Sequence, residues 1–141
     1  MRYWDSSALV PLLVKQSMTR VVTTAYREDR VQAVWWGSDL ECGSAISRLE
    51  RNGDFATTQA AQEAYDRLEA LRRAWHQVEP CTEVKETARR LLRVHAVRAA
   101  DALQLAAAFV MSEGRPGTLE FVCLDDGLTQ AARREGFACI L

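Results

Sequence analysis

The chain has 141 residues, of which 48% are hydrophobic and 26% are charged, and its formal net charge is −1. This length and composition favour a single globular domain spanning residues 1–141, with enough core to fold without disulfides. A net charge near zero argues against a protein that binds nucleic acid through a strong overall positive field, although a local basic face is compatible with it.

Short β-branched or aromatic segments alternate with longer amphipathic segments along the whole chain. Helical spacing of apolar residues predicts the helices, and Pro and Gly residues mark their ends. The expected order is strand 2–5, helix 6–16, helix 17–29, strand 31–36, helix 38–53, helix 56–77, helix 82–95, helix 99–113, strand 119–124, helix 126–136 and strand 137–141. Strands that alternate with helices predict an α/β sandwich around a parallel sheet.

The cysteines and the N-terminus indicate where the protein works. Cys42, Cys81, Cys123 and Cys139 form no C-x-x-C pair, so we interpret them as small apolar residues in a reducing compartment. The N-terminus has no apolar segment followed by a small-residue cleavage site, and no run of about 18 apolar residues occurs anywhere. We therefore expect a soluble, cytoplasmic protein.

Four acidic residues fall at related places in this order of elements. Asp5 ends the first strand, Glu41 lies in the first turn after the second strand, and Asp125 follows a late strand. The carboxyl ends of parallel strands lie along one edge of a sheet, where α/β proteins place their sites. Asp101 begins an almost wholly apolar helix and shares a face with Gln104, so we expect it to point into the same crevice.

Each acid also has a structural explanation. Asp is a favoured N-cap, and acids stabilise the positive end of a helix dipole. Ser38 and Glu41, in the stretch "SDLE", match a capping box. Taken singly, each acid is explained more simply as a cap.

Four converging carboxylates are harder to explain as caps. They repel one another and raise each other's pKa unless a divalent cation neutralises them. Oxygen ligands without His or Cys point to Mg²⁺ or Mn²⁺. Such a site suits phosphodiester hydrolysis by a metal-activated water.

The surrounding motifs resemble a known family. "DSSAL" with Asp5, "ECGSAISRLER" with Glu41, "RAADALQLAAA" with Asp101 and "FVCLDDGLTQAARREGF" with Asp125 are similar to the four acidic motifs of PIN-domain proteins, in order and spacing across the whole chain. Among these proteins the chain most resembles the toxins of VapBC-type toxin–antitoxin pairs. The resemblance implies a three-layer α/β/α sandwich, a Mg²⁺- or Mn²⁺-dependent endoribonuclease that cuts RNA, a homodimer, and a cognate antitoxin protein that inhibits it.

The resemblance also implies a role for each acid. Asp5 and Asp101 would be the principal metal ligands. Glu41 would complete the metal's coordination or orient the attacking water, and Asp125 would bind the metal directly or through water. Asp125, rather than Asp126, matches the acid of the motif.

Two positions depart from the family pattern. Cys123 stands where the family often has Ser or Thr, and Lys15 and Gln16 stand where an acid is common. These differences concern the surroundings of the four acids. Ser7 either hydrogen-bonds a ligand or water, or is an ordinary first-turn helix serine.

Other features have two explanations each. Trp35 and Trp36 either stack on an RNA base or pack in the core or a dimer interface, and we favour packing. Arg48 and the basic strip 89–98 either contact phosphates or form solvated helix faces.

Rival functions can be compared on motifs. No glycine-rich phosphate loop occurs, which argues against nucleotide binders. The remaining alternative to an enzyme is a catalytically inactive PIN-like interaction module, and the intact set of four acids argues against it.

Overall fold

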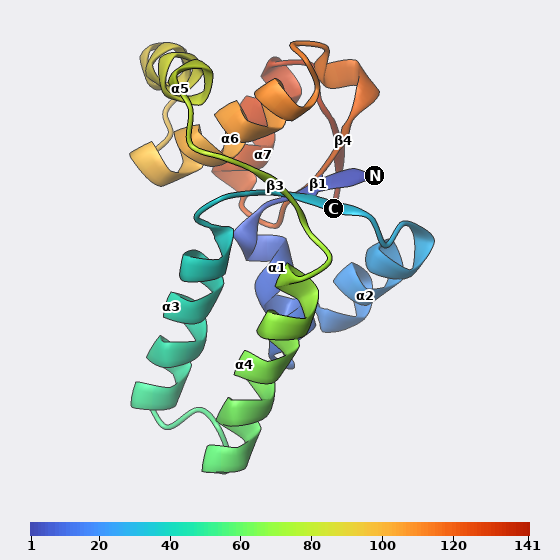
Figure 1. Ribbon diagram of the computed structural model, residues 1–141, viewed down its shortest axis with the longest axis vertical. Helices are drawn as coiled ribbons and strands as arrows, with labels where there is room; N and C mark the ends of the chain where they lie inside the picture. The colour runs from blue at the N-terminus through green and yellow to red at the C-terminus, as the bar shows by residue number, and fades with distance from the viewer.

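A parallel five-stranded sheet, in the order β3-β2-β1-β4-β5, separates two layers of helices (Figure 1). The computed structural model describes residues 1–141. In chain order its elements are β1 (Arg2–Trp4), α1 (Ser6–Leu13), α2 (Thr19–Glu28), β2 (Gln32–Trp35), α3 (Ser38–Arg51), α4 (Thr58–Arg72), β3 (His76–Val78), α5 (Thr82–Val94), α6 (Ala99–Met111), the 3₁₀ turn η1 (Pro116–Thr118), β4 (Glu120–Val122), α7 (Asp126–Arg134) and β5 (Ala138–Ile140). The three-layer α/β/α architecture expected from the sequence is confirmed.

The two helical layers are specified by side chains that alternate along the strands. Tyr3 and Phe121 point to one face, where they pack with α5, α6 and α7 in a cluster of 19 buried residues. Trp4 and Val122 point to the other face, where they pack with α1 to α4 in a cluster of 12 buried residues. Because successive residues of a strand face opposite sides, three- and four-residue strands suffice to hold both layers.

The prediction of one helix over residues 56–77 is wrong. Helix α4 ends at Arg72, and His76–Val78 forms the edge strand β3, which pairs in parallel with β2. Trp75, whose spacing indicated a helix, donates from its Nε1 to Oε1 of Gln32 at 2.9 Å. Only Val78 of the strand is buried, so the sequence of β3 carries no alternating pattern, and pairing with the sheet edge decides its conformation.

Smaller differences concern Pro11 and the cysteines. Pro11 lies inside α1, which ends at Leu13, earlier than expected. Cys42 and Cys123 are buried as predicted, whereas Cys81 is exposed at the N-cap of α5 and contradicts the interpretation as an apolar residue.

None of the helices has the length and apolar character needed to cross a membrane.

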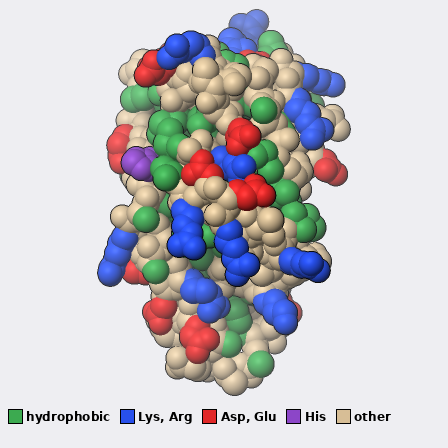
Figure 2. All heavy atoms as spheres, turned by 90° about the vertical axis from the view of Figure 1, so that its right-hand side faces the viewer, with side chains coloured by type: hydrophobic (Ala, Val, Ile, Leu, Met, Phe, Trp, Pro, Cys, Tyr) green, Lys and Arg blue, Asp and Glu red, His purple; other side chains and the backbone are tan.

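An ionic cluster lies where the chain begins. Figure 2 views the molecule from that side, where acidic side chains gather around a basic one and further basic side chains lie below them. The guanidinium of Arg2 donates to Glu120 at 2.7 Å, to Glu28 at 3.1 Å and to the carbonyl of Ala25 at 2.8 Å. These contacts tie α2 and β4 to the amino end of β1, at the edge opposite the carboxyl ends of the strands.

We expect α6 to be the helix whose packing most affects stability, because six of its residues are buried. Leu105→Ala removes a fully buried side chain and should lower the free energy of unfolding by about 2–5 kcal/mol. Leu92 of α5 is 44% exposed, so Leu92→Ala, the matched control, should change it by less than about 0.5 kcal/mol. Urea denaturation measures both; equal losses would contradict this account of the core.

Candidate functional site

The carboxyl edge of the sheet carries Asp5, Glu41 and Asp125, and the start of α6 carries Asp101. Asp5 directly follows β1 and is the N-cap of α1, while Asp125 follows β4 and is the N-cap of α7. Glu41 lies in the first turn of α3, after β2, and Asp101 in the first turn of α6.

Asp5 is the most buried of the four, at 4% exposure. Its Oδ2 accepts the N–H of Ser7 at 2.9 Å and lies 3.7 Å from Sγ of Cys123. Burial raises the pKa of Asp5 to about 6, the negative charges of Glu41 and Asp101 contribute to the rise, and the hydrogen bonds from Ser7 oppose it. Asp5 therefore lies within electrostatic range of two of the other three acids.

Glu41 is held by hydroxyl and amide donors. Its Oε2 accepts from Oγ of Ser6 at 2.5 Å and from Nε2 of Gln104 at 3.0 Å. The capping box expected for "SDLE" does not form: the N-cap of α3 is Gly37, without a side-chain hydrogen bond, and Oγ of Ser38 accepts from Gln104. The alternative explanation of Glu41 as a capping-box residue is thus wrong.

The alternative explanation as helix caps is correct for the other acids. Oδ2 of Asp101 accepts the N–H of Arg98 at 3.2 Å, and Oδ1 of Asp125 accepts the N–H of Leu128 at 2.8 Å. Asp5 and Asp125 are the N-caps of α1 and α7, whereas Asp101 is the third residue of α6 and bonds back to its N-cap, Arg98. A cap occupies one carboxylate oxygen and leaves the other available, so this role does not exclude a second one.

All four carboxylates share one arrangement. Each has one oxygen that accepts protein hydrogen bonds and a second oxygen that accepts none, and no Lys, Arg or His forms an ion pair with any of them. The oxygens without a protein donor are Oδ1 of Asp5, Oε1 of Glu41, Oδ1 of Asp101 and Oδ2 of Asp125. The protein thus orients four negative groups without neutralising them.

These residues do not form a complete metal cage, because no three His, Cys, Asp or Glu side chains lie close enough together to hold an ion. The donor chemistry still fits Mg²⁺ or Mn²⁺, since all available ligands are oxygens. Mg²⁺ usually keeps several waters and binds through one or two carboxylates. The four acids thus fit these ions in ligand chemistry, whereas their spacing forms no site of three ligands.

Ser7 and Cys123 link α1 to the loop after β4. Oγ of Ser7 accepts the N–H of Leu124 at 2.9 Å and lies 3.6 Å from Sγ of Cys123, which accepts the N–H of Asp125 at 3.3 Å. Burial, and then the charge of Asp5, raises the pKa of the Cys123 thiol to about 12. The thiol is therefore neutral at pH 7 and adds no charge beside Asp5.

Sequence reasoning missed Tyr3 and Ser6 as neighbours of the acids, and it paired Ser38 with Glu41 through a capping box that does not form. The hydroxyl of Tyr3 donates to Oε1 of Gln104 at 2.9 Å, and both side chains are almost fully buried. Tyr3 stands in an apolar segment, so the sequence indicates only a core aromatic. The signals of this network in the sequence were the spacing of Asp101 and Gln104 and the stretch "SDLE".

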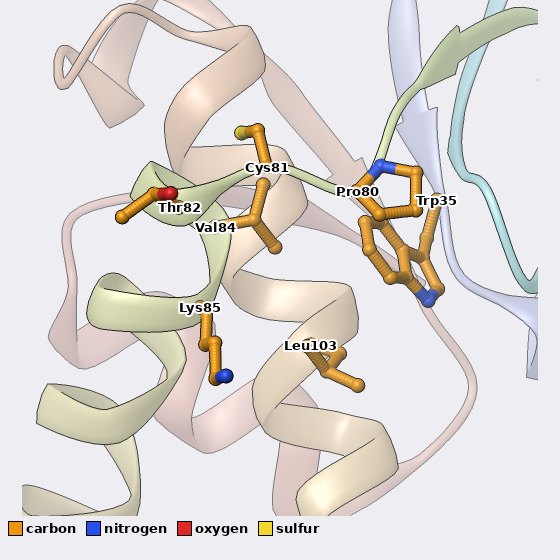
Figure 3. Close-up of a pocket in the computed structure, with 7 residues that line it drawn as sticks. All are labelled: Trp35, Pro80, Cys81, Thr82, Val84, Lys85 and Leu103. Carbon is orange, nitrogen blue, oxygen red and sulfur yellow. The ribbon is translucent and has the colours of Figure 1, made fainter.

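The two tryptophans after β2 differ in role. Trp35 is 8% exposed and belongs to the core, as we favoured, whereas Trp36 is 45% exposed. Trp35 also lines an apolar pocket of about 460 Å³, together with Pro80 and Leu103 (Figure 3). None of the four acids lines this pocket.

Part of the basic strip is engaged within the protein. Arg90 pairs with Glu135 at 2.6 Å, and His95 contacts the same carboxylate at 2.7 Å. Arg98 and Arg48 form no ion pair.

Known proteins similar to this chain include two curated relatives. No family model matches the chain. Two curated relatives, Ribonuclease VapC45 of Mycobacterium tuberculosis strain CDC 1551 / Oshkosh and Ribonuclease VapC49 of strain ATCC 25618 / H37Rv, are each 32% identical over 124 residues, covering 82% of this chain and 78% of theirs.

A solved structure supports the fold independently. The crystal structure of FitAcB from Neisseria gonorrhoeae aligns over 100% of this chain and 97% of that chain, with a TM-score of 0.67 and 17% sequence identity. Because two VapC relatives are 32% identical over 82% of the chain, and the fold agrees with the solved structure, the chain belongs to the VapC family of PIN-domain proteins.

Proposed function

We propose that this protein is a metal-dependent endoribonuclease, the toxin of a toxin–antitoxin pair, which hydrolyses phosphodiester bonds of RNA at Asp5, Glu41, Asp101 and Asp125. The relatives named ribonucleases support the substrate class. The observation that carries the proposal is the set of four unpaired carboxylates, each with one oxygen free of protein donors.

Each acid has a distinct part in this proposal. Asp5 and Asp101 would hold a Mg²⁺ or Mn²⁺ ion through their free oxygens, and Asp125 would bind it directly or through water. A bound ion would supply an activated water and would neutralise charge that develops on the phosphate oxygens. Glu41 would orient that water through Oε1, since Oε2 is already occupied by protein donors. The burial of Asp5 strengthens its attraction for a cation, because water screens the charges less there.

We further propose a homodimer, located in the cytoplasm, and a cognate antitoxin protein as partner, as the family resemblance implies. Trp36 and Leu40, 45% and 64% exposed beside the first turn of α3, offer apolar surface for protein contacts. The unpaired carboxylates offer a site for a basic side chain of the antitoxin.

Metal dependence is tested by RNA cleavage. Antitoxin-free protein should cut single-stranded RNA with Mg²⁺ or Mn²⁺ and stop when EDTA removes the ion. Asp125→Asn should lower the rate by orders of magnitude, because Asn keeps the cap but removes the charge. Asp126→Asn, at the exposed neighbouring residue, is the matched control and should cut at the wild-type rate. Cleavage that persists in EDTA, or equal rates for the two variants, contradicts the assignment.

The pH dependence of stability isolates Asp5. The pKa of Asp5 is about 6 in the folded protein, against an ordinary value of 3.8 for an aspartate, so between these values the folded state holds a proton that the unfolded state has lost. Metal-free wild type therefore loses stability from this group as pH rises from about 4 to about 6. Asp5→Asn has no such group and still caps α1.

The variant should equal wild type near pH 4 and exceed it above pH 6, by up to about 3 kcal/mol for a pKa difference of this size. Saturating Mn²⁺ should then stabilise wild type more than the variant. Urea denaturation across this pH range, with and without Mn²⁺, measures both. A stability difference that is constant with pH would show that Asp5 is not destabilised by ionisation.

The antitoxin contact is tested by charge removal. A basic side chain near Asp5 and Asp101 would replace the charge of the metal, so replacing the Lys and Arg residues of the bound antitoxin segment by Gln should relieve inhibition of RNA cleavage. Replacing Gln and Asn residues of the same segment by Ala is the control. Inhibition that survives loss of every basic residue contradicts this contact.

A further inference from the structure

We infer that Gln104 is a positioning residue, which fixes the carboxylate of Glu41 for catalysis and is itself oriented by Tyr3. This inference rests on the proposed ribonuclease function. It adds to that function a role for the buried side chains of Tyr3, Gln104 and Ser38, none of which is one of the four acids.

The contacts form an unbroken chain from the core to Glu41. The hydroxyl of Tyr3 donates to Oε1 of Gln104 at 2.9 Å, and Nε2 of Gln104 donates to Oε2 of Glu41 at 3.0 Å and to Oγ of Ser38 at 3.2 Å. Tyr3 and Ser38 are 0% exposed and Gln104 is 1% exposed. Water does not compete for the bonds of Gln104 to Tyr3 and Ser38, which are buried, whereas the bond to Glu41 is partly buried. The two buried bonds therefore fix the amide that donates to Glu41.

The carboxylate of Glu41, which can only accept, decides which end of the amide meets it, and the hydroxyl of Tyr3 holds the other end by donating to Oε1. The Gln side chain offers one carbonyl oxygen and one NH₂ group, and the hydrogen-bond network assigns their positions. In the observed orientation, both hydrogens of Nε2 have acceptors and Oε1 has a donor. The flipped amide would place its carbonyl oxygen against the carboxylate of Glu41 and leave both oxygens without a hydrogen between them.

The two carboxylate oxygens of Glu41 differ in their hydrogen bonds. Two donors, from Gln104 and Ser6, meet at Oε2, and Oε1 receives none. A glutamate side chain rotates about several bonds, and the donor from the rigid core removes much of this freedom. Donors behind a metal ligand or catalytic carboxylate typically contribute about 10–100-fold to affinity or activity.

A Gln104→Met variant tests the role, because Met has a similar shape but no NH₂ donor. Gln32→Met is the matched control: Gln32 is 2% exposed and accepts one hydrogen bond, from Trp75, at the start of β2 away from the acids. We expect Gln104→Met to lower kcat for RNA cleavage with Mn²⁺ by about 10–100-fold with little change in KM. Gln32→Met should keep the wild-type kcat. All rates are measured below the melting temperature of each variant.

Tyr3→Phe provides a gentler variant should Gln104→Met fold poorly. It removes only the hydroxyl that orients the amide, so it should lower kcat in the same direction by a smaller factor. Wild-type kcat in a folded Tyr3→Phe would contradict the orienting role of Tyr3, and wild-type kcat in a folded Gln104→Met would overturn the inference as a whole.

A double-mutant cycle separates positioning from general packing. If Gln104 acts through the carboxylate of Glu41, adding Gln104→Met to Glu41→Gln should change the residual rate by less than about twofold. A further loss as large as in the wild-type background would mean that Gln104 acts by another route, which overturns the inference.

NMR of the side-chain amide gives a readout independent of RNA. The NH₂ signals of Gln104 should shift on Glu41→Gln while those of Gln32 do not; unshifted Gln104 signals contradict the contact.

If wild type itself fails to cut RNA with either metal, the proposed function is wrong. If wild type cuts and Gln104→Met cuts equally well, only the positioning role is wrong.

Discussion

The desolvated carboxylate of Asp5 is the constraint around which the rest of the site is arranged. Asp5 stands at the end of the central strand, where its N–H donates to the carbonyl of Val122 at 3.0 Å and its side chain caps α1. Burial disfavours its charge, and the nearby charges of Glu41 and Asp101 add to that effect. Without a metal, the ionised carboxylate of Asp5 therefore lowers the stability of the fold. An Asn at this position would cap α1 equally well without that cost.

Cap and ligand are compatible roles because a carboxylate has two oxygens. Asp5, Asp101 and Asp125 each use one oxygen to accept a backbone N–H at the start of a helix. That bond fixes the side chain relative to the helix and so determines the position of the other oxygen. The same contacts that begin the helices therefore hold the groups that we propose as cation ligands, and stability arguments alone do not distinguish the two uses.

Glu41 is held by side chains of other helices, unlike the other three acids, which accept backbone N–H groups. It caps nothing, and its fixed oxygen is bound by side chains from α1 and α6, which lie on opposite faces of the sheet. Its position thus depends on how the two helical layers meet at the carboxyl edge. Cys123 adds a neutral thiol in the same region, so a departure from the usual Ser or Thr leaves the charge of the site unchanged.

The sequence by itself determined the alternation of elements, the two-sided burial of the strands and the places of the four acids, because helical periodicity, strand alternation and capping preferences are local properties of the chain. The tertiary structure alone decided β3, whose three residues are shaped by pairing with β2. It also decided that Glu41 is no capping-box residue and that Tyr3 and Gln104 stand behind it. These contacts join residues up to 101 positions apart, and no local pattern encodes which buried polar groups meet once the two layers close over the sheet.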